Sequence, residues 1–414
     1  MTPNPSSSKA SPMFNAVVRG AGPTGALTAL ALADAGWRVS LIDPQSPSQI
    51  QERSRAYAFT HSSRRLLERL GLWKSVSCIL HPFDRLDLED LGARELSRFG
   101  TRDLRNGSSE EHPVGWIGAH QELMGVLLQQ LEARPSIRLH LGNGTPGSSL
   151  AALEQEADWI IAADGALSPT REAQGIRVWR HAYRQHCLTA QVRLRGAPSR
   201  TAWERLRPEG PFALLPMGGE RFQVVWSAPA WRCRQLESLS PAAFLDALAP
   251  VLPPGVDVEE MEEPPRVFPV GLLLARRLHR GQTILVGETA HRCHPVGGQG
   301  LNLCWRDVDS LHQLALQVSD GKRPMHTLGP AYGRSRWLDV CLTLLITDSL
   351  VRIFSNRHPL LVPGRKLALQ QLRRLPVLRR TLLGMMSHGA CQRMGAAPTW
   401  AHGDQQLPAT SPLQ

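Results

Sequence analysis

The sequence lacks the cysteine spacing that disulfide frameworks and zinc modules use. Its seven cysteines are an odd number, lie far apart along the 414 residues, and include no C-x-x-C pair. Neither kind of site is therefore predicted. His291, Cys293 and His294 are close together, but no second ligand cluster accompanies them, so we expect no metal site. A chain with this cysteine usage is typical of a reducing compartment.

Long apolar runs are also missing. The strongest apolar stretch of the C-terminal half, residues 340–347, lies between Asp339 and Asp348. That stretch is far short of the roughly 20 residues needed to cross a bilayer. Residues 1–12 are rich in Pro and Ser and contain no apolar h-region, so we expect a flexible tail there and not a signal peptide. The expected location is the cytoplasm.

The charge balance is basic. Lys and Arg number 47 against 36 Asp and Glu, a formal net charge of +11, which suits an acidic partner of some kind. Nucleic acid is disfavoured, because the basic residues are not interleaved with stacking aromatics and no binding motif appears. Length and a hydrophobic content of 42% predict one large or two fused domains with a substantial core.

The N-terminal region has the pattern of a dinucleotide-binding βαβ unit. An apolar strand at residues 16–18 runs into the turn Gly20-Ala21-Gly22-Pro23-Thr24-Gly25, a helix follows, and a second strand ends at Asp43. Gly20 permits the tight turn, Gly22 lets the backbone approach a pyrophosphate, and Gly25 lets helix and strand pack closely. The helix N-terminus then meets the phosphates with free amides. A glycine turn formed for packing alone is the alternative.

Arg19 departs from this pattern, because an apolar residue is usual at the end of the first strand. Burial of an unpaired charge is costly. We therefore expect Arg19 to lie at an exposed end of the sheet or to pair with an acid.

Similar patterns occur twice more. A strand at residues 159–163 ends in Asp164-Gly165, and a strand at 283–286 ends in Gly287-Glu288. A glycine-rich turn and a helix follow the second, with the segment Pro295, Val296, Gly297, Gly298, Gln299, Gly300, Leu301 and Asn302. Between them, residues 181–275 contain strand-like segments and little helix beyond 241–248. We interpret this part as a sheet-rich domain inserted into the first.

Three motifs in this order resemble the flavin-dependent aromatic hydroxylases typified by p-hydroxybenzoate hydroxylase, and in particular the ubiquinone-biosynthesis branch. The segments Arg55-Ala56-Tyr57-Ala58 and Glu204-Arg205-Leu206-Arg207-Pro208-Glu209-Gly210-Pro211 are similar to that branch. The resemblance implies a doubly wound, Rossmann-like α/β FAD-binding domain, an inserted sheet-rich substrate domain and a helical C-terminal region. The expected boundaries are tails at 1–12 and 397–414, FAD-binding parts at 13–77, 116–180 and 276–320, substrate-domain segments at 78–115 and 181–275, and the helical region at 321–396.

The resemblance also implies which residues bind FAD. The ADP half would be held by Gly20, Gly22, Pro23, Thr24, Gly25 and Asp43. Arg55 would lie near the flavin or the pyrophosphate, and Asp164 and Gly165 match a motif associated with both FAD and NAD(P)H. Glu288 stands where the family usually has Asp or Asn facing the ribityl chain, which places flavin affinity in doubt.

The loop from Pro295 to Asn302 would contact the flavin ring. A helix N-terminus stabilises the negative charge of reduced flavin, and glycines let the backbone lie against the ring. His291 is interpreted either as a proton donor or as a hydrogen-bonded core residue. Of Tyr57, Tyr183 and Tyr332, none lies in a motif that carries over the family's phenol-activating role, so no catalytic residue is named.

The C-terminal region has no Asp or Glu between residues 351 and 403, and its many arginines alternate with Leu and Val. This composition favours a basic amphipathic helix pair on the inner face of an anionic membrane. The alternative is a capping helix pair whose charges are solvated. The sequence does not indicate an oligomeric state.

The expected function is an FAD-dependent monooxygenase that uses O2, with NAD(P)H or another reductant as electron donor. Its substrate would be a lipophilic aromatic ring, a prenylated quinone precursor of ubiquinone or plastoquinone type. Two alternatives stay open: a flavin-dependent reductase of an isoprenoid double bond, and a non-catalytic flavoprotein scaffold of a quinone-biosynthesis assembly.

Overall fold

The computed structural model describes residues 14–104, 112–144, 147–356, 358 and 360–389. The two expected tails lie outside these residues. Among the described residues, no helix combines the length and apolar character that a membrane span requires.

The first lobe is built on a six-stranded sheet. Its order is β15 (His279–Arg280), β16 (Thr283–Leu285), β9 (Trp159–Ala162), β1 (Asn15–Arg19), β2 (Arg38–Asp43) and β8 (Ile137–Leu141). The strands run parallel except for β15, which pairs with β16 in the antiparallel sense. The carboxyl ends of β1, β9 and β16 therefore meet at one edge, where an open α/β sheet binds its ligands.

Most helices surround this sheet or extend from it. They are α1 (Pro23–Asp34), α2 (Pro47–Gln51), α3 (His61–Arg69), α4 (Trp73–Ser77), α5 (His120–Glu132), α6 (Gly147–Glu156), α7 (Pro169–Ala173), α10 (Gln299–Ser319) and α11 (Leu328–Phe354). On β1, Ala16 and Val18 face the main core, whereas Val17 faces a small core with Leu150 and Leu153 of α6. This alternation covers both faces of a parallel sheet.

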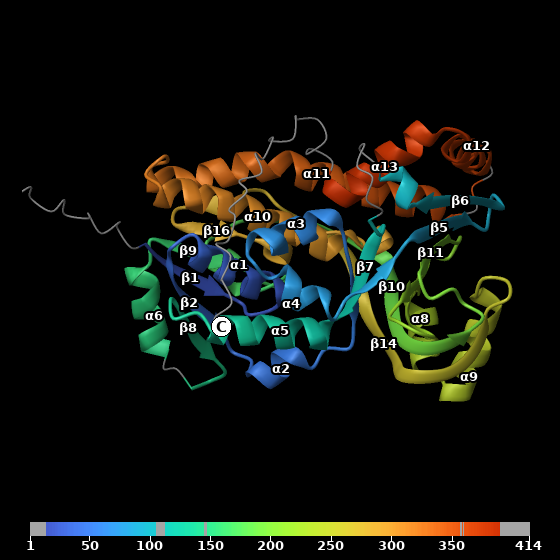
Figure 1. Cartoon of the computed structure of the whole chain (residues 1–414), viewed down its shortest axis with the longest axis horizontal. Helices are drawn as coiled ribbons and strands as arrows, with labels where there is room; N and C mark the ends of the chain where they lie inside the picture. Colours follow the sequence, from blue (N-terminus) through green and yellow to red (C-terminus); the bar gives the residue numbers. More distant parts are fainter. Residues whose placement is uncertain (1–13, 105–111, 145–146, 357, 359, 390–414) are drawn as a thin grey trace, which may run out of the picture.

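The second lobe is an eight-stranded sheet that packs against α8 (Ala230–Glu237) and α9 (Pro241–Leu248). Its order is β17 (His291–Arg292), β14 (Asp257–Ala275), β10 (Val178–Arg195), β13 (Arg221–Pro229), β12 (Phe212–Pro216), β11 (Thr201–Leu206), β5 (Arg85–Asp90) and β6 (Glu95–Gly100). All neighbours are antiparallel except β11 and β5. The long strands β10 and β14 run between the two lobes (Figure 1).

A small sheet and the C-terminal helices complete the molecule. The small sheet joins β3 (Ala56–Phe59), β7 (Gly115–Ala119) and β4 (His81–Phe83). The helices α12 (Leu361–Arg374) and α13 (Pro376–His388) follow α11, and α12 packs on β6. In Figure 1 these red helices lie beside the second lobe. Short 3-10 turns occur at η1 (Thr101–Asp103), η2 (Ala249–Val251), η3 (Gly287–Thr289), η4 (Val296–Gly298) and η5 (Met325–Thr327).

Two sequence expectations are settled by these elements. The inserted part contains little helix beyond the expected residues 241–248, mainly the eight-residue helix α8. Only Cys233 and Leu236 of α8 are buried, so its apolar pattern is too short to stand out. Arg19 has the acidic partner that its position requires: its guanidinium group bonds the Glu154 carboxylate of α6.

Candidate functional site

The first two glycine motifs meet through close backbone contact. A Cβ atom on Gly20, whose φ is +98°, would lie 2.4 Å from the Ala163 carbonyl oxygen. A Cβ atom on Gly25 would lie 1.7 Å from the Gly20 carbonyl oxygen. Both positions therefore exclude every residue but glycine, and the turn after β1 is locked against the end of β9.

Gly22 differs from Gly20 and Gly25, because a Cβ atom there would meet nothing within 4 Å. Its φ and ψ of −65° and 179° suit any residue. The protein itself therefore does not require glycine here, and the open space lies at the N-terminus of α1. This is what close approach of a ligand's phosphates to the backbone would require.

Asp43 ends β2 beside this turn and is nearly buried. Its Oδ2 accepts a hydrogen bond of 2.7 Å from the Ala21 backbone N–H, and its Oδ1 accepts one of 2.8 Å from the Gln45 N–H. The carboxylate thus fixes the glycine turn, while each oxygen keeps a second lone pair for a ribose hydroxyl.

The second motif is tied to the third through Thr289. The Thr289 hydroxyl donates to Asp164 Oδ1 at 3.2 Å and accepts from the Gly165 N–H at 3.1 Å. The buried side chain of Arg171 donates to the Thr289 carbonyl oxygen at 2.9 Å. Asp164 also accepts from the Thr170 N–H at the start of α7. The hydrogen bonds of Asp164 therefore hold this turn in shape.

The third motif contacts the first and is held in place by a hydrogen bond to Asp307. A Cβ atom on Gly287 would lie 2.9 Å from Thr24 Cγ2. The Gly287 N–H donates to Asp307 Oδ2 at 2.9 Å, and His291 Nε2 shares a 2.6 Å hydrogen bond with the same oxygen. His291 is buried, so the geometry is that of a hydrogen-bonded core histidine.

Asp307 belongs to a buried charge network between α10 and α11. Arg336 Nε donates to Asp307 Oδ1 at 2.7 Å, and Asp339 pairs with both Arg336 and Arg306 at 2.8 Å. Burial alone would raise the pKa of Asp307, but the charges of His291 and Arg336 outweigh it and hold the pKa well below its usual range. The carboxylate is therefore ionised under all ordinary conditions.

The loop from Pro295 to Asn302 is shaped by two consecutive left-handed glycines, Gly297 and Gly298, with φ of +70° and +61°. A Cβ atom on Gly298 would lie 2.9 Å from Ala58 Cβ, whereas Gly300 has open space around it. The Asn302 side chain is buried, donates to the Ala58 carbonyl oxygen at 2.7 Å and accepts from Ser63 Oγ at 2.7 Å. Its amide fixes the loop against β3.

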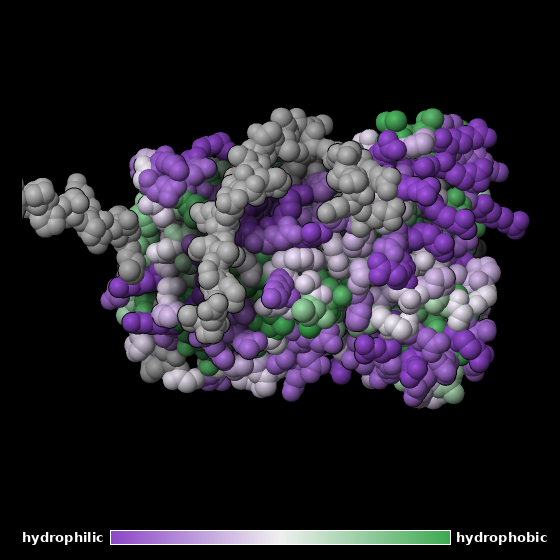
Figure 2. Space-filling model, viewed as in Figure 1, coloured by the Kyte–Doolittle hydropathy of each residue, from purple (hydrophilic) through white to green (hydrophobic). Residues whose placement is uncertain are grey.

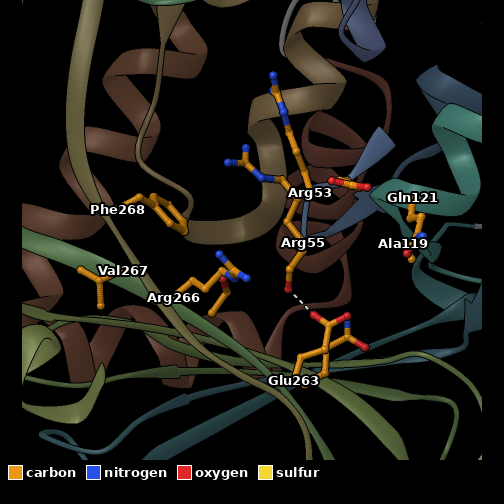
Figure 3. A pocket seen from close by; sticks show the side chains of 12 residues that line it. Arg53, Arg55, Ala119, Gln121, Glu263, Arg266, Val267 and Phe268 are labelled. Atoms are coloured by element: carbon orange, nitrogen blue, oxygen red, sulfur yellow. Dashed lines mark hydrogen bonds between the residues drawn. The ribbon is translucent and has the colours of Figure 1, made fainter. Parts of the chain in front are cut away.

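A cavity of about 480 Å³ opens between the two lobes, and Arg55 is the one expected FAD residue in its lining (Figure 3). Arg53 and Arg55 line one side, and Glu263, Arg266 and Phe268 of β14 line the other. The Arg55 guanidinium lies 5.6 Å from the Phe268 ring centroid. Ser54 donates a hydrogen bond to the Glu263 carboxylate, so the cavity wall bridges the lobes. Three arginines on one cavity suit a ligand with phosphate groups.

Glu288 is exposed although both neighbours, Gly287 and Thr289, are buried. Its charge contributes to raising the pKa of Tyr57, which burial raises most and the nearby Arg55 lowers in part. Glu288 and Arg55 therefore both lie close enough to Tyr57 for their charges to act on its hydroxyl. The Tyr57 hydroxyl itself shares a 2.9 Å hydrogen bond with His120 Nδ1.

Glu204 of β11 is a buried acid that sequence reasoning left without a role. It lies against the glycine loop, and the Gly297 backbone N–H donates to it. Burial raises the pKa of Glu204 to about 8, and that one hydrogen bond only partly offsets the rise. The second lobe thus contacts the loop with a carboxyl group that is largely neutral at pH 7.

A comparison with protein families agrees with this geometry. A family described as an FAD binding domain matches residues 13–79 and 109–336. The chain belongs to this family. FAD is accordingly its cofactor, and the close contacts that unite the three motifs are the contacts of an FAD-binding domain.

Full-length relatives narrow the class. The chain is 29% identical to 3-demethoxyubiquinol 3-hydroxylase of Escherichia coli (strain K12) over 88% of this chain and 96% of that protein. It is 28% identical to the ubiquinone hydroxylase UbiL of Rhodospirillum rubrum over 92% and 90%. The resemblance to the ubiquinone-biosynthesis branch is confirmed, and the chain is an FAD-dependent monooxygenase of the aromatic-hydroxylase type.

Solved structures show the same fold. The crystal structure of p-nitrophenol 4-monooxygenase from Pseudomonas putida superimposes with a TM-score of 0.72 at 18% sequence identity, covering 91% of this chain and 98% of that one. The predicted Rossmann-like α/β fold is thereby confirmed.

The residues present fit FAD. Gly22 leaves space at a helix N-terminus, Asp43 offers free lone pairs, and Arg55 supplies a positive charge on the adjoining cavity. In the described part of the chain, no three His, Cys, Asp or Glu side chains are grouped as metal ligands would be. FAD supplies the redox chemistry and the activation of O2 when bound.

Sequence reasoning missed the residues that hold the motifs together. These residues bond partners that are distant in the sequence. Asp307 and Arg336 are 29 positions apart, and Asp164 and Thr289 are 125 positions apart. A single sequence carries no periodic signal for such pairs. Glu204 lies in the segment 204–211 that resembles the ubiquinone-biosynthesis branch, and the structure buries it with every other residue of β11.

Proposed function

We propose that the protein hydroxylates the aromatic ring of a prenylated quinone precursor, with FAD as cofactor, O2 as oxidant and NAD(P)H or a similar reductant as electron donor. The convergence of three glycine turns on one edge of the sheet, together with full-length relatives named as ubiquinone hydroxylases, supports this proposal. In this proposal the residues named for FAD in the sequence keep those roles, and Asn302 acts by fixing the loop.

The second lobe and the C-terminal helices offer the apolar surroundings that a lipophilic ring needs. Val296 of the glycine loop packs in one cluster with Leu206 of β11, Val351 and Phe354 of α11, and Leu369 of α12. We infer that this cluster covers the reacting ring and keeps water from it. Exclusion of water would limit side reactions that consume O2 without hydroxylating the substrate.

We also propose that α11 to α13 rest on a membrane surface. Most of the large apolar side chains that are exposed among the described residues lie between residues 337 and 378, and Leu360 and Val377 are 81% and 70% exposed. Figure 2 shows green surface at the upper right, where Figure 1 has α12 and α13, set among purple. An amphipathic surface of this kind binds lipid interfaces.

The arginines support this proposal less than the apolar side chains do. Arg365, Arg373 and Arg379 pair with Asp90, Glu95 and Asp103 of the second lobe, as a capping helix pair would. The membrane proposal therefore depends on the exposed apolar side chains. Co-sedimentation with anionic vesicles at low salt tests it, with a Leu360→Ser/Val377→Ser variant as comparison. Equal recovery of both proteins in the supernatant would end the proposal.

The reaction is tested on purified protein and on a deletion strain. We expect a flavin absorption spectrum, NAD(P)H oxidation and substrate-dependent O2 consumption, and accumulation of a quinone lipid lacking one hydroxyl when the gene is deleted. Flavin reduction with loss of an isoprenoid double bond and no O2 uptake would favour the reductase alternative. Stable partner binding without flavin or NAD(P)H oxidation would favour the scaffold.

A further inference from the structure

A second cavity lies outside the FAD site and is lined by four arginines. It has a volume of about 290 Å³, and its walls are Arg177, Arg276, Arg277 and Arg280 with Gly175 and Ile176. No Asp or Glu belongs to this lining. We call it the arginine cavity.

The four guanidinium groups have no acidic partners among the described residues. The acid of the neighbouring helix α7, Glu172, lies 3.9 Å from Arg171 and Arg180 instead. Elsewhere in the described chain exposed arginines commonly have a carboxylate close by, such as Asp84 beside Arg200 and Asp348 beside Arg352. The arginine cavity therefore concentrates positive charge that the protein does not neutralise.

The backbone holds these arginines together. Val178 of β10 pairs with Ala275 of β14, and the Arg276 N–H donates to the Arg177 carbonyl oxygen at 2.9 Å just beyond that pair. Arg177 and Arg276 are thus neighbours across two strands, where like charges destabilise the sheet. Arg280 reaches the same place from β15, and its guanidinium group donates to the Gln174 carbonyl oxygen.

We propose that the arginine cavity binds a phosphate group that carries at least two negative charges. Planar guanidinium groups with several N–H donors match phosphate oxygens, and such charge-assisted bonds are the strong ones. A cavity of this volume encloses a phosphate or a diphosphate but not a folded partner's surface. Either a soluble diphosphate or a lipid phosphomonoester presents this chemistry, and the experiment separates the two.

The test uses FAD-saturated protein, so that the glycine turn after β1 does not take up the probe. Inorganic pyrophosphate is titrated against KCl of equal ionic strength, and the melting temperature and calorimetric heat are followed. We expect saturable binding by the wild type and at least a tenfold loss of affinity in Arg276→Gln/Arg280→Gln. Arg134→Gln/Arg138→Gln is the matched control, because it removes the same charge near β8, at the opposite edge of the sheet.

A parallel titration uses vesicles of neutral lipid with and without phosphatidic acid. Binding of these vesicles that the cavity variant loses and the control keeps, without pyrophosphate binding, would assign a lipid source. The melting temperature of the unliganded variants checks the fold, and Arg277→Gln provides a second, single change. The proposal is overturned if pyrophosphate and phosphatidic acid bind the cavity variant as they bind the control, or bind neither wild type nor control. It does not depend on the hydroxylase function.

Discussion

At the scale of single residues, the glycines of the first turn separate ligand binding from folding. Gly22 has an ordinary backbone conformation and free space, whereas a Cβ on Gly25 would lie 1.7 Å from a carbonyl oxygen. We predict that Gly22→Trp loses FAD while its apo form melts close to the wild-type apo temperature. Gly25→Ala should instead destabilise the fold by several kcal/mol, about 3 or more, as backbone clashes do.

Absorbance at the flavin band and melting of the apo proteins check this pair. A Gly22→Trp protein that keeps its yellow colour after dialysis would contradict the assignment of the turn to the pyrophosphate. The Gly25→Ala protein is the control for unfolding, because it should lose FAD and melting temperature together.

Glu204 predicts a stability that falls as the pH rises. Burial raises its pKa from an ordinary 4.5 to about 8, so the folded protein holds a proton that the unfolded chain releases between these values. Stability from this group is therefore full below about pH 4.5 and is lost progressively up to about pH 8. At about 1.36 kcal/mol per pKa unit, the loss is roughly 4 to 5 kcal/mol at most.

Glu204→Gln keeps an acceptor for the Gly297 N–H but does not ionise. We expect the variant to lose less unfolding free energy than the wild type between pH 6 and pH 9, measured by urea denaturation at both values. The same pH dependence in both proteins would show that the Glu204 carboxyl ionises in the folded state at its ordinary pKa.

Residue-scale prediction from sequence succeeded where a backbone constraint forces one residue type. Gly20 and Gly25 could be identified because no other residue fits those contacts, and Asp43 because it ends a strand at a fixed distance from them. Glu204 could not be assigned, since its partner Gly297 is far along the chain and the bond forms only when the two lobes meet.

At the scale of elements, Asp307 joins α10, α11 and the turn at Gly287. Asp307→Ala leaves Arg336 buried with one acidic partner fewer and removes the acceptor of the Gly287 N–H. Removal of one partner of a buried ion pair costs about 3 to 5 kcal/mol. We expect that loss in urea unfolding, together with weaker FAD retention. Asp320→Ala, beside exposed Lys322 at the end of α10, is the control and should change stability by less than about 1 kcal/mol.

Arg365 fixes α12 to the second lobe. Its buried guanidinium lies 3.2 Å from Asp90 Oδ2 of β5 and donates to the Ile353 and Phe354 carbonyl oxygens at 3.1 Å. Arg365→Ala should release α12, so that limited proteolysis cuts near residues 355–375 at rates well above those of wild type. Lys366→Ala, next along the same helix, should be cut like wild type. Equal protection of both variants would mean that apolar packing alone holds α12.

Elements with a long apolar period were predictable and the short polar ones were not. The strand and helix of the first βαβ unit could be predicted because α1 buries a continuous run of eight of its twelve residues. By contrast, α8 buries only two of its eight residues. The alternating residues of β5 indicate a strand but not its place in the sheet. The sequence of β5 does not indicate that it pairs with β11. The paired residues Arg85 and Thr201 are 116 positions apart in the chain.

At the scale of the whole molecule, the two lobes meet around the cavity that Ser54 and Glu263 bridge. A ligand that contacts Gly22 and the glycine loop stabilises the first lobe directly, and it stabilises the second lobe through the contact of Gly297 with Glu204. FAD in excess should therefore raise the melting temperature of a single cooperative transition. At 100 times its dissociation constant the gain is about 2.7 kcal/mol by mass action.

Glu263→Ala tests whether FAD can replace a contact between the lobes. Loss of the Ser54 contact removes one hydrogen bond between the two lobes without touching the glycine turns. The variant should melt lower without FAD yet regain most of the difference when FAD bridges the lobes, because the ligand replaces a contact that the side chain supplied. Colourless, folded wild-type protein that shows no such shift with excess FAD would exclude the turns as a flavin site and the hydroxylase function with them.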